Sequence, residues 1–188
     1  MCGLCGVVAP GSPPERESVE RMLDGLAHRG PDGRGVYADE GVCLGHLRLA
    51  IIDLSDAGLE PFASDDGALQ LVYNGELYNY LELRKELRAK GHRFRSETDT
   101  EVLLAGYREW GPRCVARFNG MWAFAIWDAK RRTLFASRDR LGIKPFYYRF
   151  DGDRFSFASE PWVLADDRRA NRRAVRDYIE QGYLDEDD

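Results

Sequence analysis

Cys2 follows the initiator Met1 directly, and this position can give one residue two reactive groups. Because cysteine is small, removal of Met1 by an aminopeptidase is expected, and Cys2 then carries a thiol and a free α-amine. A thiolate is a strong nucleophile, but the thiol needs a base or a lowered pKa to lose its proton near neutrality. An α-amine has a pKa of about 7.7–8.0 and can be that base. The position therefore predicts an N-terminal nucleophile that activates itself.

Cys2 and Cys5 also form a C-x-x-C pair, which admits a redox or zinc-binding interpretation. A zinc site needs a second pair of ligands, whereas Cys43 and Cys114 are isolated and the three histidines show no ligand spacing. The residues after Cys5 predict a strand, in which positions three apart point to opposite faces and lie about 10 Å apart, too far for a disulfide. We therefore expect Cys5, Cys43 and Cys114 to be buried thiols.

The composition predicts one packed domain, since 44% of the 188 residues are hydrophobic and 12% are aromatic. A net charge of −5 provides no basic surface for nucleic acid or for an anionic membrane. No apolar stretch approaches the length of about 20 residues that spans a bilayer, and the N-terminus lacks the pattern of a signal peptide. These features predict a cytoplasmic protein with free thiols.

Apolar periodicity and the positions of glycine and proline predict an α+β domain with one core. Strands are expected around residues 6–8 and over 36–37, 42–47, 49–53, 69–73, 121–128, 133–137, 146–150 and 154–158. Helices are expected over 13–27, 78–90, 99–110 and 171–181, with Ser12 and Asn171 as the first and last N-caps. This order indicates stacked sheets with helices outside.

Arg48 stands between two leucines in a predicted strand, where burying its charge is costly without an anionic partner. That partner is either a structural carboxylate or the carboxylate of a ligand, which the planar guanidinium can hold with two hydrogen bonds.

Two further polar segments also have two interpretations each. Asn74-Gly75 is either a tight turn or an oxyanion hole, formed by the Asn74 side-chain N–H and the unscreened Gly75 backbone N–H. The segment 96–101 resembles a helix start capped by Ser96 or Thr98, and it could instead direct Asp99 into a pocket as a counter-charge for an ammonium group. With an N-terminal cysteine, these groups could hold a free amino acid and attack its side-chain amide.

Seven segments of the chain match, in order, the motifs of one enzyme family. They are MCGLCG at 1–6, HRGPDG at 28–33, GHLRLAIID at 45–53, NGELYN at 74–79, SETDTE at 96–101, FNGMWAF at 118–124 and RDRLGIKP at 138–145. Through them the chain resembles the N-terminal glutaminase domain of the asparagine synthetase family, a class II glutamine amidotransferase. The resemblance covers about residues 2–160, and RGPD and NGELYN are closer to asparagine synthetases than to sugar-phosphate or phosphoribosyl amidotransferases.

The resemblance implies a four-layer αββα sandwich of the N-terminal-nucleophile hydrolase type, with Cys2 at the start of a central strand. Residues 1–188 are then a single domain, in which 166–188 form a C-terminal helix that leads toward an absent synthetase domain. The catalytic residues implied are Cys2, Asn74 and Gly75. The residues implied to bind substrate are Arg48, Ile52, Glu76 and Asp99.

The implied reaction hydrolyses L-glutamine to glutamate and ammonia through a γ-glutamyl thioester on Cys2. This half-reaction needs no metal or cofactor, and ATP and Mg are expected only in the absent synthetase domain. The implied partners are L-glutamine and a synthetase domain or subunit that receives the ammonia for an ATP-dependent amidation. Nucleic acid and membrane are not expected as partners, and a homodimer is left open.

Two features depart from the family. Family members usually carry Gln where Glu60 precedes Pro61, a change that could alter the pocket rim or the ammonia exit. The synthetase domain with its Ser-Gly-Gly-x-Asp-Ser loop is absent from the 188 residues, so the ammonia acceptor stays open. A catalytically silent regulatory or docking module for a separate synthetase is the main alternative, and a redox or metal-binding protein is the third.

Overall fold

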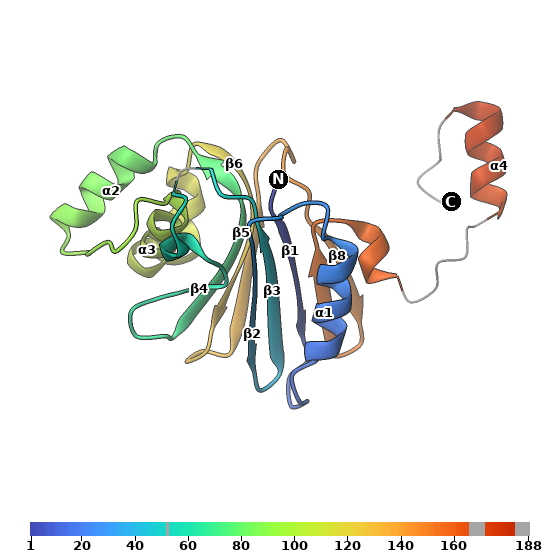
Figure 1. Ribbon diagram of the computed structural model, residues 1–188, viewed down its shortest axis with the longest axis horizontal. Helices are drawn as coiled ribbons and strands as arrows, with labels where there is room; N and C mark the ends of the chain where they lie inside the picture. The colour runs from blue at the N-terminus through green and yellow to red at the C-terminus, as the bar shows by residue number, and fades with distance from the viewer. Residues whose placement is uncertain (52, 166–171, 183–188) are drawn as a thin grey trace.

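Two antiparallel sheets stack face to face, with helices on their outer faces (Figure 1). The computed structural model describes residues 1–51, 53–165 and 172–182. One sheet has five strands in the order β2-β3-β1-β9-β8, with bounds Gly33–Asp39, Val42–Arg48, Gly3–Val8, Arg154–Ala158 and Tyr147–Asp151. The other has four strands in the order β4-β5-β6-β7, with bounds Phe62–Ala63, Leu69–Leu77, Gly120–Asp128 and Thr133–Arg138.

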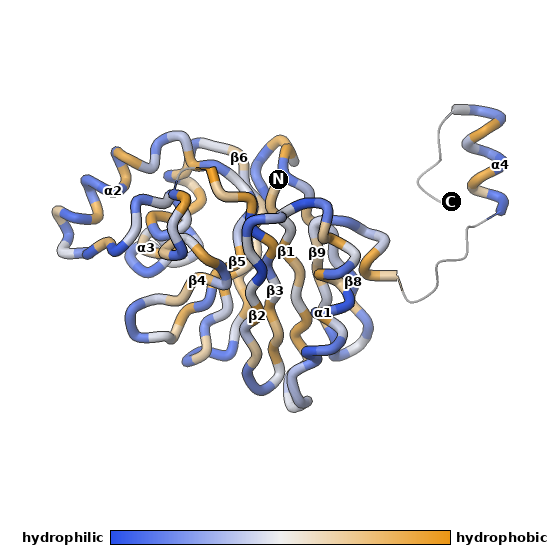
Figure 2. Tube along the Cα trace, viewed as in Figure 1, coloured by the Kyte–Doolittle hydropathy of each residue, from blue (hydrophilic) through white to orange (hydrophobic). Residues whose placement is uncertain are grey.

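The described helices flank these sheets or follow them in the chain. The α-helices are α1 (Arg16–Gly25), α2 (Tyr80–Ala89), α3 (Asp99–Trp110) and α4 (Arg172–Gln181). Three short 3₁₀ helices lie at Asp56–Gly58, Gly111–Arg117 and Pro161–Leu164. Hydrophilic and hydrophobic residues alternate along α2, as expected for a helix with one buried face (Figure 2). No helix in the described ranges is both long and apolar enough to cross a membrane.

Three apolar cores separate four layers, which confirms the predicted αββα order. Val19 and Leu23 of α1 pack on the five-stranded sheet beside Cys5. Leu87 and Leu103 belong to a second core, where α2 and α3 cover the four-stranded sheet. The third core joins the inner faces of the two sheets and contains Leu4, Val42, Leu44, Val72, Ala123, Ala125, Trp127 and Phe157. The central strands β1, β3, β5 and β6 are therefore buried on both faces for most of their length.

Most predicted elements lie within a few residues of the observed ones, but the strand predicted over 49–53 is wrong. Strand β3 ends at Arg48, and residues 49–51 and 53 are irregular. The reason lies in Arg48, whose guanidinium donates to the carbonyl oxygens of Asp53 and Ser55. These bonds turn the chain back on itself, which an extended strand would prevent.

The predicted cap of the first helix is also wrong. Helix α1 begins at Arg16, and Ser12 lies in a turn where its N–H donates to the Ala9 carbonyl (3.1 Å) and its carbonyl accepts from Gly41 (2.9 Å). The other predicted cap, Asn171, lies outside the described residues, as do 166–170 and 183–188 of the predicted C-terminal helix. Cys5, Cys43 and Cys114 are buried free thiols, as predicted.

Leu103 and Leu81 provide a matched test of the α2/α3 core. Leu103 is fully buried, whereas Leu81 is 59% exposed. We expect Leu103→Ala to lower the free energy of unfolding by about 2–5 kcal/mol, because it removes buried methyl groups and leaves a cavity. Leu81→Ala should change it by less than about 0.5 kcal/mol. Urea denaturation measures both, and equal losses would contradict this account of the core.

Candidate active site

A pocket of about 150 Å³ collects the predicted site residues from several elements. Its lining includes six of the seven predicted residues, namely Cys2, Arg48, Asn74, Gly75, Glu76 and Asp99. The seventh, Ile52, lies outside the described residues. These six come from the residue before β1, from β3 and β5, and from the start of α3.

Strand pairing and one buried arginine hold Cys2 in place. Strand β1 begins at Gly3, which pairs with Leu47, so that Cys2 lies beside the end of β3. The Leu49 N–H donates to Cys2 Sγ (3.3 Å). Arg29 Nε donates to the Cys2 carbonyl (2.9 Å), and Arg29 Nη1 pairs with Glu160 (2.7 Å). The nucleophile candidate is therefore fixed on both sides.

The electrostatic surroundings of the Cys2 thiol oppose its ionisation. Burial is the main cause of its raised pKa, and the negative charge of Glu60 adds to the effect. The Leu49 N–H, the N-terminal ammonium and Arg48 act in the opposite direction. In this structure the α-amine belongs to Met1, which also lines the pocket. The backbone nitrogen of Cys2 is then part of the peptide bond with Met1 and cannot accept the thiol proton.

Asn74 and Gly75 form part of strand β5 and do not form the tight turn that Asn-Gly often makes. They pair with Ala123 and Trp122 of β6. The Asn74 side-chain nitrogen is buried without a hydrogen-bond partner among the described residues. A Cβ atom on residue 75 would lie 2.4 Å from the Met121 carbonyl oxygen, so the strand spacing requires glycine there. The pocket thus contains a donor that the fold leaves unused.

Arg48 is buried, and no carboxylate among the described residues forms an ion pair with it. Its Nη1 donates to the Ser55 carbonyl (2.7 Å) and its Nη2 to the Asp53 carbonyl. A Cβ on Gly58 would lie 2.6 Å from Arg48 Nη2, so the 53–58 loop packs closely on the guanidinium. Carbonyl oxygens carry only partial charge, and Arg48 therefore keeps its capacity to bind an anion in the pocket.

Asp99 begins helix α3 and faces the pocket as a buried carboxylate. Thr98 is the N-cap, since its side chain accepts from the Glu101 N–H. Asp99 Oδ2 accepts from the Tyr73 hydroxyl (2.8 Å) and from the Leu77 N–H (2.9 Å). Burial raises the pKa of Asp99, and an ammonium group beside it would lower that pKa again. Glu76 is exposed at the rim of the pocket.

Sequence reasoning missed three residues that support the pocket. Tyr73 orients Asp99 through its hydroxyl. Arg84 of α2 donates to the carbonyls of Ser96 and Thr98 (2.9 Å each) and so holds the segment before Asp99. Lys144 lines the pocket, with Nζ 3.9 Å from Met1 Sδ. Arg84 shares the apolar stripe of α2, and a charge on such a stripe is a signal for a buried partner.

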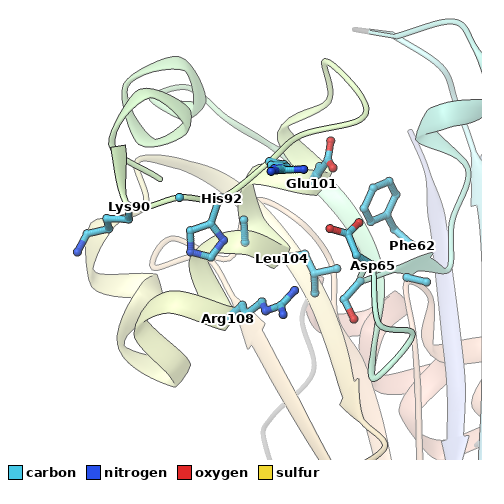
Figure 3. A pocket seen from close by; sticks show the side chains of 12 residues that line it. Phe62, Asp65, Lys90, His92, Glu101, Leu104 and Arg108 are labelled. Atoms are coloured by element: carbon cyan, nitrogen blue, oxygen red, sulfur yellow. The ribbon is translucent and has the colours of Figure 1, made fainter. Parts of the chain in front are cut away.

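A second pocket, of about 360 Å³, lies between α3 and the segments around Phe62 and His92 (Figure 3). None of the predicted site residues that the structure describes lines it. Lys90 and His92 at its edge pair with Glu109 at 3.1 and 3.0 Å. Within the described ranges no group of three or more His, Cys, Asp or Glu could hold a metal ion. The pocket around Cys2 is therefore the better candidate for chemistry.

Comparison with known proteins identifies the family. The sequence matches the glutamine amidotransferase domain family over residues 1–188. The chain belongs to this family. A solved structure of glutamine phosphoribosylpyrophosphate amidotransferase from Bacillus subtilis superposes with a TM-score of 0.73 at 23% identity, covering 87% of this chain and 43% of that one. This likeness confirms the fold, a four-layer αββα sandwich.

Curated relatives of this amidotransferase domain include asparagine synthetases. Glutamine-hydrolyzing asparagine synthetase 3 of Bacillus subtilis (strain 168) is 48% identical over 164 residues, which are 85% of this chain and 26% of that protein. A putative glutamine-hydrolyzing asparagine synthetase 2 of Methanocaldococcus jannaschii is 39% identical over 208 residues, 98% of this chain and 40% of that protein. The chain thus spans less than half the length of these relatives.

Gly75 gives a direct test of the pocket geometry in this amidotransferase domain. In Gly75→Ala the new Cβ would lie 2.4 Å from the Met121 carbonyl oxygen, so β5 must move away from β6. We expect glutamine turnover to fall by about 10²–10³-fold, because the movement would disturb the oxyanion hole predicted at Asn74 and Gly75, and loss of one such donor has an effect of this size. Glutamate release and thermal unfolding are measured on the same sample. Turnover within twofold of the wild type would contradict the close contact between residue 75 and the Met121 carbonyl oxygen.

Proposed function

We propose that this domain hydrolyses L-glutamine to glutamate and ammonia through a γ-glutamyl thioester on Cys2. The observation that carries the proposal is the buried, unpartnered side-chain nitrogen of Asn74 in the same pocket as the thiol. An unused buried donor is costly unless a ligand or a reaction intermediate satisfies it. A tetrahedral oxyanion formed at Cys2 would satisfy it.

The first step needs the free α-amine of Cys2, so Met1 must be removed. Met1 Sδ lies 3.9 Å from Lys144 Nζ and 4.0 Å from Arg29 Nη2, and loss of Met1 also clears this side of the pocket. The amine, directly or through a water molecule, takes the thiol proton, and the thiolate attacks the side-chain carbonyl carbon of glutamine. The carbonyl oxygen becomes an oxyanion beside Asn74 and Gly75.

Collapse of the tetrahedral intermediate breaks its C–N bond. The protonated amine of Cys2 returns its proton to the leaving nitrogen, so that ammonia departs and a γ-glutamyl thioester remains. Water then adds to the thioester with the same amine as base, and the second collapse releases glutamate and the thiol. Each oxyanion donor contributes about 3 kcal/mol to lowering such barriers.

The charged groups of the pocket are complementary to the α-carboxylate and the α-ammonium of a free amino acid. Arg48 would hold the α-carboxylate, since its guanidinium is buried and binds carbonyl oxygens alone among the described residues. Asp99 and Glu76 would hold the α-ammonium, and Ile52 would contact the substrate. A zwitterion supplies both charges at once, which lowers the cost of keeping Arg48 and Asp99 away from water.

We further propose that the ammonia serves an ATP-dependent amidation of the asparagine synthetase type, as the names of the relatives suggest. A synthetase domain would follow residues 166–188, or a separate synthetase subunit would bind this chain. ATP and Mg would bind to that domain or subunit. Residues 1–188 would act as a single glutaminase unit that uses no cofactor of its own. The reducing cytoplasm suits its free thiols.

Cys2→Ala tests the proposed nucleophile, with Cys5→Ala as the matched control. Cys5 is fully buried under α1 and does not line the pocket. We expect Cys2→Ala to abolish glutamate release from glutamine without ATP or acceptor, and Cys5→Ala to retain it. Protein that mass spectrometry shows to keep Met1 should be as inactive as Cys2→Ala. Release that persists in Cys2→Ala would overturn the proposal, and no release from Met1-free wild type would favour a silent docking module.

Arg48→Lys tests the carboxylate site, because a point charge replaces a group that makes two parallel hydrogen bonds. We expect KM for glutamine to rise by about tenfold or more, with a smaller change in kcat. Arg95→Lys is the control, since Arg95 also donates to a carbonyl, that of Ala63, but does not line the pocket. An unchanged KM in Arg48→Lys would disprove the assignment.

A further inference from the structure

Glu60 lines the same pocket as Cys2 and is almost fully buried, with 5% of its side chain exposed. Its Oε2 accepts from the Tyr73 N–H (2.6 Å), and its Oε1 accepts from the Thr100 hydroxyl (3.2 Å). The backbone of Glu60 packs directly against Gly35 of β2, where a Cβ on residue 35 would lie 2.1 Å from the Glu60 carbonyl oxygen. Glycine at this position therefore allows the close approach of the Glu60 segment. A buried carboxylate without a role in the proposed mechanism thus lines the same pocket as Cys2.

His46 of β3 completes the environment of the Glu60 carboxyl. Its Nε2 lies 2.9 Å from the Tyr73 carbonyl oxygen and 3.3 Å from Glu60 Oε2. Since a carbonyl oxygen only accepts, Nε2 carries the hydrogen. Burial lowers the pKa of His46 to about 4, so the ring is neutral near pH 7 and forms no ion pair with Glu60. Glu60 thus accepts from the Tyr73 N–H, and His46 donates to the Tyr73 carbonyl oxygen. Together they hold both backbone polar groups of the residue before Asn74.

The charges around Glu60 leave its carboxylate without a cation. The charge of Arg48 of β3 partly offsets the effect of burial on Glu60, but the Arg48 Nη atoms donate to the carbonyls of Ser55 and Asp53 and not to Glu60. Asp99 of α3 adds a second negative charge, and Tyr73 and His46 are neutral. No lysine or arginine among the described residues lies within ion-pairing distance of Glu60. Burial therefore raises its pKa well above that of an ordinary glutamate.

We propose that Glu60 is a positioning residue that holds the strand leading into Asn74 and whose ionisation opposes formation of the Cys2 thiolate. In its neutral form the carboxyl keeps its contacts with Tyr73 and Thr100 and leaves the thiol unhindered. In its ionised form it places a negative charge in the pocket where the thiolate must form. The ionisation of Glu60 then raises the pH at which Cys2 becomes reactive. This inference rests on the proposed role of Cys2 as nucleophile.

Glu60→Gln separates the charge from the contacts, because an amide has nearly the same shape, accepts from Tyr73 and can donate to Thr100. We expect the pH midpoint for alkylation of Cys2 by iodoacetamide to fall by about one unit, which is about a tenfold faster reaction below the midpoint. Mass spectrometry quantifies the modified Cys2 in Met1-free protein, and Cys2→Ala defines the background from the buried thiols.

Asp56→Asn is the matched control, since it removes one negative charge from an exposed position of the same loop. Its midpoint should move by less than about 0.2 units, because solvent screens an exposed charge. A midpoint of Glu60→Gln equal to that of the wild type would overturn the proposal, and so would an equal shift in Asp56→Asn. Alkylation needs no glutamine, so this result is independent of whether the domain hydrolyses glutamine.

The contacts of Glu60 are tested by Glu60→Ala, which removes both of them along with the charge. We expect its kcat for glutamine to fall at every pH, whereas Glu60→Gln should shift the rising limb of kcat/KM to lower pH. A loss in Glu60→Gln at all pH values without a shift would mean a merely structural role and would overturn the charge effect.

Stability provides a measurement that does not depend on activity. A buried acid with a raised pKa in the folded state stabilises the fold fully below its unfolded pKa of about 4.3, and this contribution is lost as pH rises through the folded pKa. We therefore expect the urea midpoint of the wild type to fall relative to that of Glu60→Gln as pH rises above about 4.3. A constant difference between the two proteins would contradict a buried, ionising Glu60.

Discussion

Antiparallel pairing of β1 with β3 is the contact on which the site depends. It aligns Gly3 with Leu47, so Cys2 must lie where β3 ends, beside Arg48. The same strand β3 carries His46 to the inner side of its sheet, where its ring reaches the Tyr73 carbonyl of the opposite sheet. One pairing register therefore sets the nucleophile candidate, the candidate anion site and the contact between the two sheets. A shift of β1 by one residue along β3 would turn Cys2 to the other face of the sheet.

The pocket is electrostatically incomplete without a ligand. Asp99 and Glu60 are buried acids, and the buried cation Arg48 is bound to carbonyl oxygens and not to either acid. Burial raises the pKa of both acids, which shows how poorly the pocket supports negative charge. A zwitterionic amino acid would bring a carboxylate for Arg48 and an ammonium for Asp99, as proposed above, and so replace interactions that water would otherwise supply. The same poor support for negative charge makes a thiolate costly unless a base lies close to it, as the α-amine of an N-terminal cysteine does.

Polar side chains outside the pocket hold its edges in place. Arg29 joins the Cys2 carbonyl to Glu160, and Arg84 ties α2 to the segment before Asp99. Asp139 accepts from the backbone N–H groups of Trp122 and Lys144 and so holds the 138–145 loop against β6. Each of these groups is partly or fully buried and bonded, so each bond is strengthened by the low local polarity. They account for several of the sequence motifs that supply no reacting group.

The α+β class, the bounds 99–110 of α3 and the position of β6 to within one residue follow from the amino-acid sequence, because apolar periodicity and capping are local signals. The sequence also singled out Cys2, since its place behind Met1 is a property of the chain alone. The choice between a turn and a strand at Asn74 depends on the fold, because pairing with β6 overrides the local preference of Asn-Gly. The fold also determines that Arg48 binds loop carbonyls and that Glu60 is buried in the same pocket as Cys2. Burial and hydrogen-bond partners arise from contacts between segments far apart in the chain, and no local pattern records them.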